Sequence, residues 1–211
     1  MSPKPKKKKT MKKNKHASLF KILLIPFVIL TIYFAANDLP NPNKLSLFGE
    51  EEVPPQYIPI YKAAEKEYGV PWNLLAAHHR VETKFSTMKS LISPVGAEGH
   101  MQFMPCTFVG WSHPTCGDLG KGDIPEEQKT DPKAIEKYGG YGVDANGDGL
   151  ADPFQIEDAV FSAANYLAHN GAANGEIEQA VYSYNHSTEY VDDVLYFAER
   201  YIEKSTENDN Q

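Results

Sequence analysis

One glutamate, Glu82, is the residue of this sequence best placed to do acid–base chemistry. It stands near the end of the stretch WNLLAAHHRVET, residues 72–83, in which apolar residues recur at helical spacing. His78 and Glu82 share a row of this helix, next to the apolar stripe. A carboxylate at the edge of a buried face is costly unless it is paired or protonated. Glu82 is therefore expected to be either a solvated carboxylate beside Lys84 or a protonated acid.

A Gly-rich turn follows this helix. The sequence GAEG, residues 96–99, leads directly into HMQFMP, residues 100–105. Glycine allows a backbone to approach a ligand closely, and Gln102 adds an amide just after the turn. The two parts together favour an acid beside a ligand-binding turn over a solvated surface carboxylate.

These residues resemble a known family. RVETKF, followed by SPVGAEGHMQFMP, is similar to the signature of lysozyme-like lytic transglycosylases of the SLT type, which show a Glu-Ser pair and then G-A-x-G-x-x-Q-x-M-P. Thr83 stands where the family usually has Ser and keeps the hydroxyl, whereas His100 stands where Leu is common. A third motif, Y-x-Y-N-H-S-x-x-Y-V at residues 182–191, also resembles the family, in which a Tyr-Asn pair lines the cleft near the acid.

The resemblance covers residues 56–202 and implies a mostly α-helical, lysozyme-like domain of the goose type, with a groove for a glycan strand. The periodicity of the sequence independently favours a mostly α fold, because no long alternating strand pattern appears. The resemblance implies Glu82 as the catalytic residue. The substrate-binding residues that it implies are Gly99, Met101, Gln102, Tyr184, Asn185 and Tyr190.

The reaction that the resemblance implies is that of a peptidoglycan lytic transglycosylase, a lyase. It cleaves the β-1,4 bond between N-acetylmuramic acid and N-acetylglucosamine and leaves a 1,6-anhydro end, with one glutamate as acid and then base. No cofactor is required. Two alternatives remain open. A hydrolytic muramidase would need a second carboxylate, for which Glu98 and Asp144 are the candidates, and a membrane-tethered wall-binding module would need no acid.

Two metal sites are further alternatives. His78, His79 and Glu82 have a spacing that permits metal binding, but no HExxH motif or third ligand accompanies them. The loop after residue 143 matches the first part of a calcium-binding loop, although Gln155 occupies the twelfth position. The calcium ligands would be Asp144, Asn146, Asp148 and Asp152. The alternative interpretation of this loop is an Asx-rich turn.

The chain has two cysteines, Cys106 and Cys116. An even pair that closes a short loop outside the membrane is typical of a disulfide, and two reduced thiols are the alternative.

Charge is unevenly spread along the chain. Residues 1–37 contain nine of the 21 basic residues and no acidic residue, whereas the remainder holds 12 basic and 28 acidic residues. An apolar run at residues 19–36 follows the basic tail, which indicates a single-pass membrane anchor with the tail on the cytoplasmic side. We therefore expect contact with a membrane through 19–36 and with peptidoglycan strands outside, and no nucleic-acid partner. Cleavage of this segment as a signal peptide, giving a secreted protein, is the alternative.

The sequence divides into a basic tail (1–18), the anchor (19–36), a Pro-rich linker (37–57), the transglycosylase domain (58–203) and a disordered tail (204–211). Within the domain, helices are predicted at 60–68, 72–82, 157–170, 176–184 and 192–203, and a short helix after Asp131-Pro132.

Overall fold

The computed structural model describes residues 52–209, and the basic tail, the anchor and residues 37–51 of the linker lie outside this range. The helices in order are α3 (Ile58–Tyr68), α4 (Trp72–Thr83), α5 (Pro105–Val109), α6 (Glu126–Lys129), α7 (Pro132–Tyr138), α8 (Ile156–His169), the 3₁₀ helix η1 (Ala172–Asn174), α9 (Ile177–Tyr184) and α10 (Thr188–Asp209). The only β pairings in this range are isolated bridges around Glu98. The mostly helical fold class is therefore confirmed for the part of the chain that is described. No helix between residues 52 and 209 combines the length and the apolar character that a membrane crossing needs.

The ends of two helices follow directly from the sequence. Gly69 ends α3 in the left-handed conformation, with a φ of 71°, which glycine adopts at little cost. The Asp131 carboxylate accepts a hydrogen bond from the backbone N–H of Lys133 and caps α7, and Gly139 ends that helix. These are the stop and start signals on which the sequence-based prediction of both helices rests.

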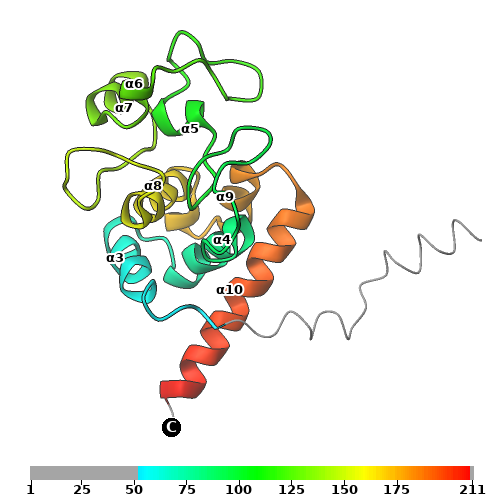
Figure 1. Ribbon diagram of the computed structural model, residues 1–211. Coiled ribbons are helices and arrows are strands. Elements are labelled where there is room, and N and C mark those ends of the chain that lie inside the picture. The colour runs from blue at the N-terminus through cyan, green and yellow to red at the C-terminus, as the bar shows by residue number, and fades with distance from the viewer. Residues whose placement is uncertain (1–51, 210–211) are drawn as a thin grey trace, which may run out of the picture. The chain divides into compact units, whose positions relative to one another are not determined.

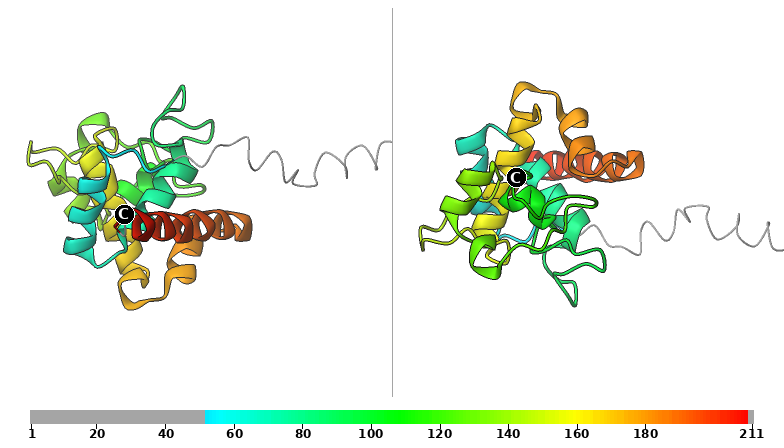
Figure 2. Two further views of the ribbon diagram at one scale, coloured as in Figure 1. Left: turned by 90° about the horizontal axis from the view of Figure 1, so that it is seen from below. Right: turned by 90° about the horizontal axis from the view of Figure 1, so that it is seen from above.

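The helices form two groups that contact each other little. Helix α4 packs against α3, α8 and α10, and α9 packs against α8 and α10. The short helices α5, α6 and α7 contact one another and lie together at the top of Figure 1. Figure 2 shows the long helix α10, orange to red, from two further sides. The catalytic candidate Glu82 therefore lies on the helix that most of the larger group surrounds.

Helix α4 is buried around nearly its whole circumference, which a single apolar stripe does not predict. Residues 73–80 are all buried, polar ones included. The polar side chains have partners that offset the cost of burial. Asn73 donates to the backbone carbonyl of Ala198 over 2.9 Å, and the Arg80 guanidinium lies 4.1 Å from the centre of the Phe197 ring.

Two details differ from the sequence-based predictions. Helices α5 and α6 and the 3₁₀ helix were not predicted, because each is too short to show a periodic pattern. Helix α10 begins at Thr188 and continues to Asp209, so residues 204–209 are helical, where a disordered tail was expected. This stretch contains no glycine or proline to stop the helix. Cys106 and Cys116 form the disulfide that the sequence indicated, with Cα atoms 5.7 Å apart, and it ties the start of α5 to the loop after it.

Candidate active site

Glu82 lies in the last turn of α4 and is half-buried. The Tyr190 hydroxyl donates a hydrogen bond to Oε1 of Glu82 over 2.5 Å. Burial raises the pKa of Glu82 to about 7, and the bond from Tyr190 partly offsets that rise. Near neutral pH the Glu82 carboxyl group is therefore divided between its protonated and its ionised form, as a general acid and base requires.

Two tyrosines from the third motif surround this carboxyl group. Tyr190, in the first turn of α10, is buried, and Tyr184, the last residue of α9, is half-buried. The Tyr184 hydroxyl donates to the backbone carbonyl of Met101 over 2.7 Å. Burial, reinforced by the charge of Glu82, raises the pKa of both tyrosines well above the ordinary value. Both hydroxyl groups therefore keep their protons while Glu82 changes charge.

His78 completes the group around the acid. Its ring is fully buried and lies 5.0 Å from the Tyr184 ring and 5.7 Å from the Tyr190 ring, between centroids. Its Nδ1 atom is 2.9 Å from the Tyr190 hydroxyl. Its Nε2 atom is buried and has no hydrogen-bond partner among the described residues. Burial lowers the pKa of His78 to about 3, so the ring is neutral at physiological pH.

The backbone makes an unusual turn directly after Glu82. Lys84, Phe85 and Ser86 all have positive φ values, between 52° and 65°, which cost side-chain-bearing residues about 1 kcal/mol or more each. The N–H of Lys84 bonds to the carbonyl of Arg80 and that of Phe85 to the carbonyl of His79, as in a Schellman end. The turn fixes the direction in which the chain leaves the acid.

Thr83 joins this turn to the Gly-rich turn. Its hydroxyl donates to the backbone carbonyl of His100 over 2.8 Å and accepts from the N–H of Ser86 over 3.2 Å. The hydroxyl that Thr83 shares with the Ser of the family motif is therefore used in holding the two segments together.

A second set of polar groups, which the sequence did not indicate, is centred on His79 of α4. His79 bonds to the Tyr61 hydroxyl through Nδ1 and to the Ser86 hydroxyl through Nε2, each over 2.6 Å. Ser86 in turn bonds to Nδ1 of His100 over 2.6 Å, and Nε2 of His100 bonds to the carbonyl of Phe154 over 2.8 Å. Because these residues come from four separate segments, no spacing in the sequence indicates that they meet. His78 and Glu82 both bond to Tyr190, whereas His79 bonds to other residues. The described residues contain no cluster of three or more His, Cys, Asp or Glu that could hold a metal ion.

The Gly-rich turn has a strict requirement for glycine at one position. Gly99 has a φ of 83°, and a Cβ atom there would lie 2.0 Å from the backbone oxygen of Pro153. The side-chain amide of Gln102 donates to the carbonyls of Leu91 and Gly99, over 2.9 and 2.8 Å, and so holds the turn closed.

Met101 and Asn185, two of the predicted substrate-binding residues, have contrasting positions. The Met101 side chain is fully buried in the core, and its backbone carbonyl holds Tyr184. Its role in this conformation is therefore packing, which corrects the expectation of a substrate contact. Asn185 is exposed where α9 ends, and substrate contact by Asn185 stays a prediction.

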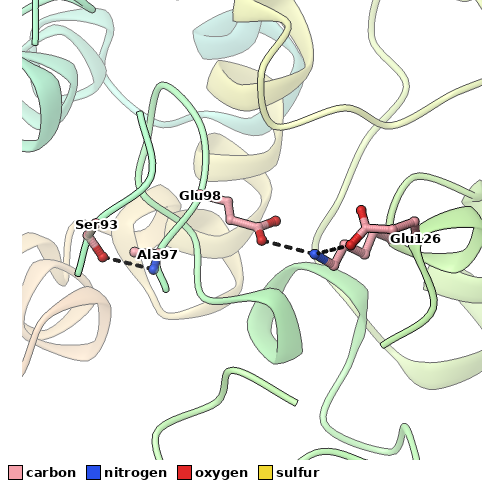
Figure 3. Close-up of polar contacts among 5 residues, drawn as sticks. Ser93, Ala97, Glu98 and Glu126 are labelled. Atoms are coloured by element: carbon pink, nitrogen blue, oxygen red, sulfur yellow. Dashed lines mark hydrogen bonds and ion pairs between the residues drawn. The ribbon is translucent and has the colours of Figure 1, made fainter. Parts of the chain in front are cut away.

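The two candidates for a second carboxylate already have partners. Glu98 accepts from the Lys129 ammonium over 3.0 Å, and the same ammonium lies 2.9 Å from Glu126 (Figure 3). The Asp144 carboxylate accepts hydrogen bonds from three backbone N–H groups, those of residues 147–149. A second carboxylate is not among the causes of the raised pKa of Glu82 in the described part of the chain.

The acidic loop is organised by its own backbone. Asp158, which the sequence did not single out, is fully buried and accepts from the N–H groups of Ala145, Asn146 and Asp152. The oxygens of Asp144 and Asp148 accept from N–H groups within the loop. These bonds account for the loop conformation as an Asx-rich turn, and a calcium ion at Asp144, Asn146, Asp148 and Asp152 stays a prediction from the sequence pattern.

Glu82 lines neither of two hollows on the surface of residues 52–209. The larger, of about 900 Å³, lies between α9 and α10 and has Tyr182 and Leu195 in its wall. The smaller, of about 350 Å³, lies between the Gly-rich turn, α5 and α6, and includes Phe103 and Glu98. The Phe103 ring is 5.5 Å from that of Tyr184, between centroids. The smaller hollow therefore shares a wall with the group around the acid.

Comparison with known proteins gives a match for one part of the chain. No curated protein sequence matches the chain. Residues 135–179, from α7 into α9, match the family model described as Transglycosylase SLT domain. The match supports a lytic transglycosylase-like domain that acts on peptidoglycan, and the mostly helical fold is consistent with it.

Proposed function

We propose that this protein is a peptidoglycan lytic transglycosylase that uses Glu82 as its single acid and base. Its substrate is the β-1,4 bond between N-acetylmuramic acid and N-acetylglucosamine, and its product carries a 1,6-anhydro-muramic acid end. The observation that carries the proposal is the half-buried carboxyl group of Glu82, whose pKa of about 7 lies close to neutral pH and whose Oε1 accepts a hydrogen bond from Tyr190.

The reaction requires two proton transfers by the same carboxyl group. Protonated Glu82 donates to the oxygen that links the two sugars, the bond from that oxygen to C1 of the muramic acid breaks, and the glucosamine leaves with the proton. The ionised Glu82 then accepts the proton of the muramic acid C6 hydroxyl, and O6 forms a bond to C1. Glu82 ends protonated, ready for the next cycle, and no water is consumed.

The surroundings of Glu82 suit this cycle. Burial favours the protonated form that starts the reaction, and the bond from Tyr190 stabilises the anion that the first step creates. The substrate's own acetamido group can stabilise positive charge at C1, where most glycosidases use a second carboxylate. That Glu98 and Asp144 are engaged elsewhere favours this single-acid reaction over a hydrolytic muramidase.

A peptidoglycan digest tests the proposal. The purified full-length protein, in detergent, is compared with its Glu82→Gln variant, and the products are analysed by mass spectrometry. We expect products one water lighter than hydrolytic ones from the wild type, and a rate about 10²–10⁴-fold lower from the variant. Reducing ends from the wild type would indicate a muramidase. Binding without cleavage by either protein would indicate a wall-binding module.

We also propose that residues 19–36 anchor the enzyme in the cell membrane, with the domain on the wall side. The support is the apolar run beside a basic tail. Membrane fractionation and protease protection of the domain in intact cells test this location.

A further inference from the structure

We propose that His78 is a positioning residue for the acidic proton of Glu82. By donating a hydrogen bond to the Tyr190 oxygen, His78 directs the Tyr190 hydroxyl proton toward Oε1 of Glu82, and the acidic proton of Glu82 therefore stays on Oε2. This inference rests on the proposed function, since it describes how the same carboxyl group presents its proton to a substrate. The chain of contacts runs from Nδ1 of His78 to the Tyr190 hydroxyl, over 2.9 Å, and from that hydroxyl to Oε1 of Glu82, over 2.5 Å.

The tautomer of His78 follows from its surroundings. A neutral imidazole carries one proton, on either Nδ1 or Nε2. Nε2 is buried without a partner among the described residues, so a proton there would be an unpaired buried donor. Unpaired buried N–H groups are costly and rare. The proton therefore resides on Nδ1, where the Tyr190 oxygen accepts it. The low pKa of His78 agrees with a ring that never holds both protons near neutral pH.

The direction of the second bond then follows. The Tyr190 oxygen accepts from His78, and its own single proton points to the nearest remaining acceptor, Oε1 of Glu82. When Glu82 is protonated, Oε1 still accepts from Tyr190, so the acidic proton resides on Oε2. Without the donor from His78, protonated Glu82 can instead turn its proton toward the Tyr190 oxygen, away from a substrate.

The same chain sets the strength of the Tyr190 bond. A hydroxyl that accepts a hydrogen bond becomes a better donor, because neighbouring bonds in a chain polarise one another. The titratable groups that face Glu82 from the helices around it are Tyr184, from α9, and Tyr190, from α10. Tyr184 donates to the carbonyl of Met101 and not to Glu82. His78 therefore acts on Glu82 through Tyr190 alone.

Two variants of the full-length protein separate this role from packing. His78→Phe keeps the ring between Tyr184 and Tyr190 and removes both nitrogens. His78→Asn keeps an amide donor close to the position of Nδ1. We expect His78→Phe to lower kcat about 5- to 10-fold, the effect of losing one hydrogen bond, with KM changed less than about 2-fold. We expect His78→Asn to recover most of the rate, and the pH at which activity falls to rise in His78→Phe.

A double variant tests the route of the effect. In a Tyr190→Phe background the link is absent, so adding His78→Phe should change neither kcat nor the pH profile further. An equal loss in both backgrounds would overturn the proposal, as would wild-type rates and pH dependence in His78→Phe.

A spectroscopic measurement keeps the inference independent of the reaction and of the folding of any variant. ¹⁵N NMR of wild-type protein labelled in histidine reports the tautomer, and infrared titration of the carboxyl group reports the pKa of Glu82. We expect Nδ1–H for His78 and a higher Glu82 pKa in His78→Phe than in His78→Asn. A proton found on Nε2 would refute the positioning role. Failure of the digest with these spectra as expected would refute the proposed reaction alone.

Discussion

Helix α4 carries two adjacent histidines, His78 and His79, that are both fully buried but begin two different hydrogen-bond networks. The His78 network passes through Tyr190 and ends on the carboxyl group of Glu82. The His79 network joins Tyr61 to Ser86 and continues through another histidine to a backbone carbonyl. Neighbouring residues of one type therefore serve two different networks around the same helix.

The His79 network has one arrangement of protons when its histidines are neutral. The Phe154 carbonyl only accepts, so Nε2 of His100 carries a proton and Nδ1 accepts from Ser86. The Ser86 oxygen then accepts from Nε2 of His79, whose Nδ1 accepts from Tyr61. Burial lowers the pKa of both histidines, which keeps them neutral. Every nitrogen is paired, and the network holds the strained turn after Glu82.

The difference shows how one helix separates stability from reactivity. A network that ends on a carbonyl has a fixed acceptor and a single stable state. A network that ends on Glu82 has an end group whose charge changes near neutral pH, and it leaves one histidine nitrogen unpaired. We therefore expect changes in the His79 network to affect mainly stability and changes in the His78 network to affect mainly the pKa and the rate.

The largest expected effect is on stability, in His79→Phe. The substitution keeps a ring but leaves the hydroxyls of Tyr61 and Ser86 without their partner, at a cost of roughly 2–4 kcal/mol for two lost buried bonds. Urea unfolding near pH 7 measures this loss. The matched variant His78→Phe should lose less than about 1 kcal/mol, because it also removes an unpaired nitrogen. Equal losses in the two variants would contradict the comparison.

Glu82→Gln should stabilise the protein, in a pH-dependent way. The folded-state pKa of about 7 lies above the ordinary value, so the folded protein binds a proton that the unfolded chain releases as pH rises from about 4.5 to 7. Glu82 therefore lowers stability above pH 7 and has little effect near pH 4. We expect Glu82→Gln to be more stable by roughly 1–3 kcal/mol at pH 8 and equal to the wild type at pH 4.

Unfolding curves at both pH values measure this difference. Glu98→Gln is the control, since it removes a carboxylate that is paired with Lys129 and should not stabilise the protein. The buried histidines His78 and His79 give the opposite pH dependence of stability. Their folded-state pKa values are depressed, so the stability that they contribute is present above about pH 6.5 and is lost as pH falls toward 3. A gain in Glu82→Gln at pH 4 as large as at pH 8 would show that relief of the buried charge is not its cause.

The sequence predicted the elements whose signals are local. Gly69, Asp131-Pro132 and Gly139 mark helix ends by their backbone preferences, and the structure confirms each of them. The third motif was expected to lie near Glu82 through Tyr184 and Asn185, and in the structure another residue of the same motif, Tyr190, bonds to Glu82 directly. Both results depend on information carried within a few residues or within a recognisable motif.

The rest could not be predicted because it depends on contacts between distant segments. The burial of α4 on nearly all sides arises from α3, α8 and α10 together, so polar residues such as His79 could not be distinguished from surface residues by periodicity. Met101 was assigned to the substrate because the motif shows which residues recur and not which way a side chain points. Residues 84–86 are consecutive and left-handed, but none of them is a glycine, so the sequence does not indicate this conformation.

Tyr190→Phe should have a smaller effect than these, and on the rate. Losing the bond from Tyr190 removes a donor that stabilises the Glu82 anion, so the pKa of Glu82 rises further and the activity should fall at a higher pH. We expect kcat to drop about 10-fold at the wild-type optimum, since a bond to a charged group contributes on the order of 1.5 kcal/mol. Initial rates on soluble glycan strands across pH 5–9 measure both changes. This range extends about two pH units to either side of the expected pKa.

Tyr184→Phe is the matched control, because its hydroxyl bonds to the Met101 carbonyl and not to the acid. It should leave the pH profile in place. A shift of the profile in Tyr184→Phe as large as in Tyr190→Phe would show that the two tyrosines act on Glu82 through a shared effect and not through the direct bond.

A further effect on stability is expected at Thr83, whose hydroxyl joins the turn after Glu82 to His100. Thr83→Val keeps the shape and removes the hydroxyl that bonds to the His100 carbonyl and to the Ser86 N–H, so we expect a loss of about 1–2 kcal/mol. Thr83→Ser, which restores the residue of the family motif, should stay within about 0.5 kcal/mol of the wild type. Because the hydroxyl holds backbone and does not touch Glu82, both variants should keep the wild-type pH profile. A shifted profile in Thr83→Val alone would show that the turn also controls the acid, and the separation between the two networks around α4 would then be incomplete.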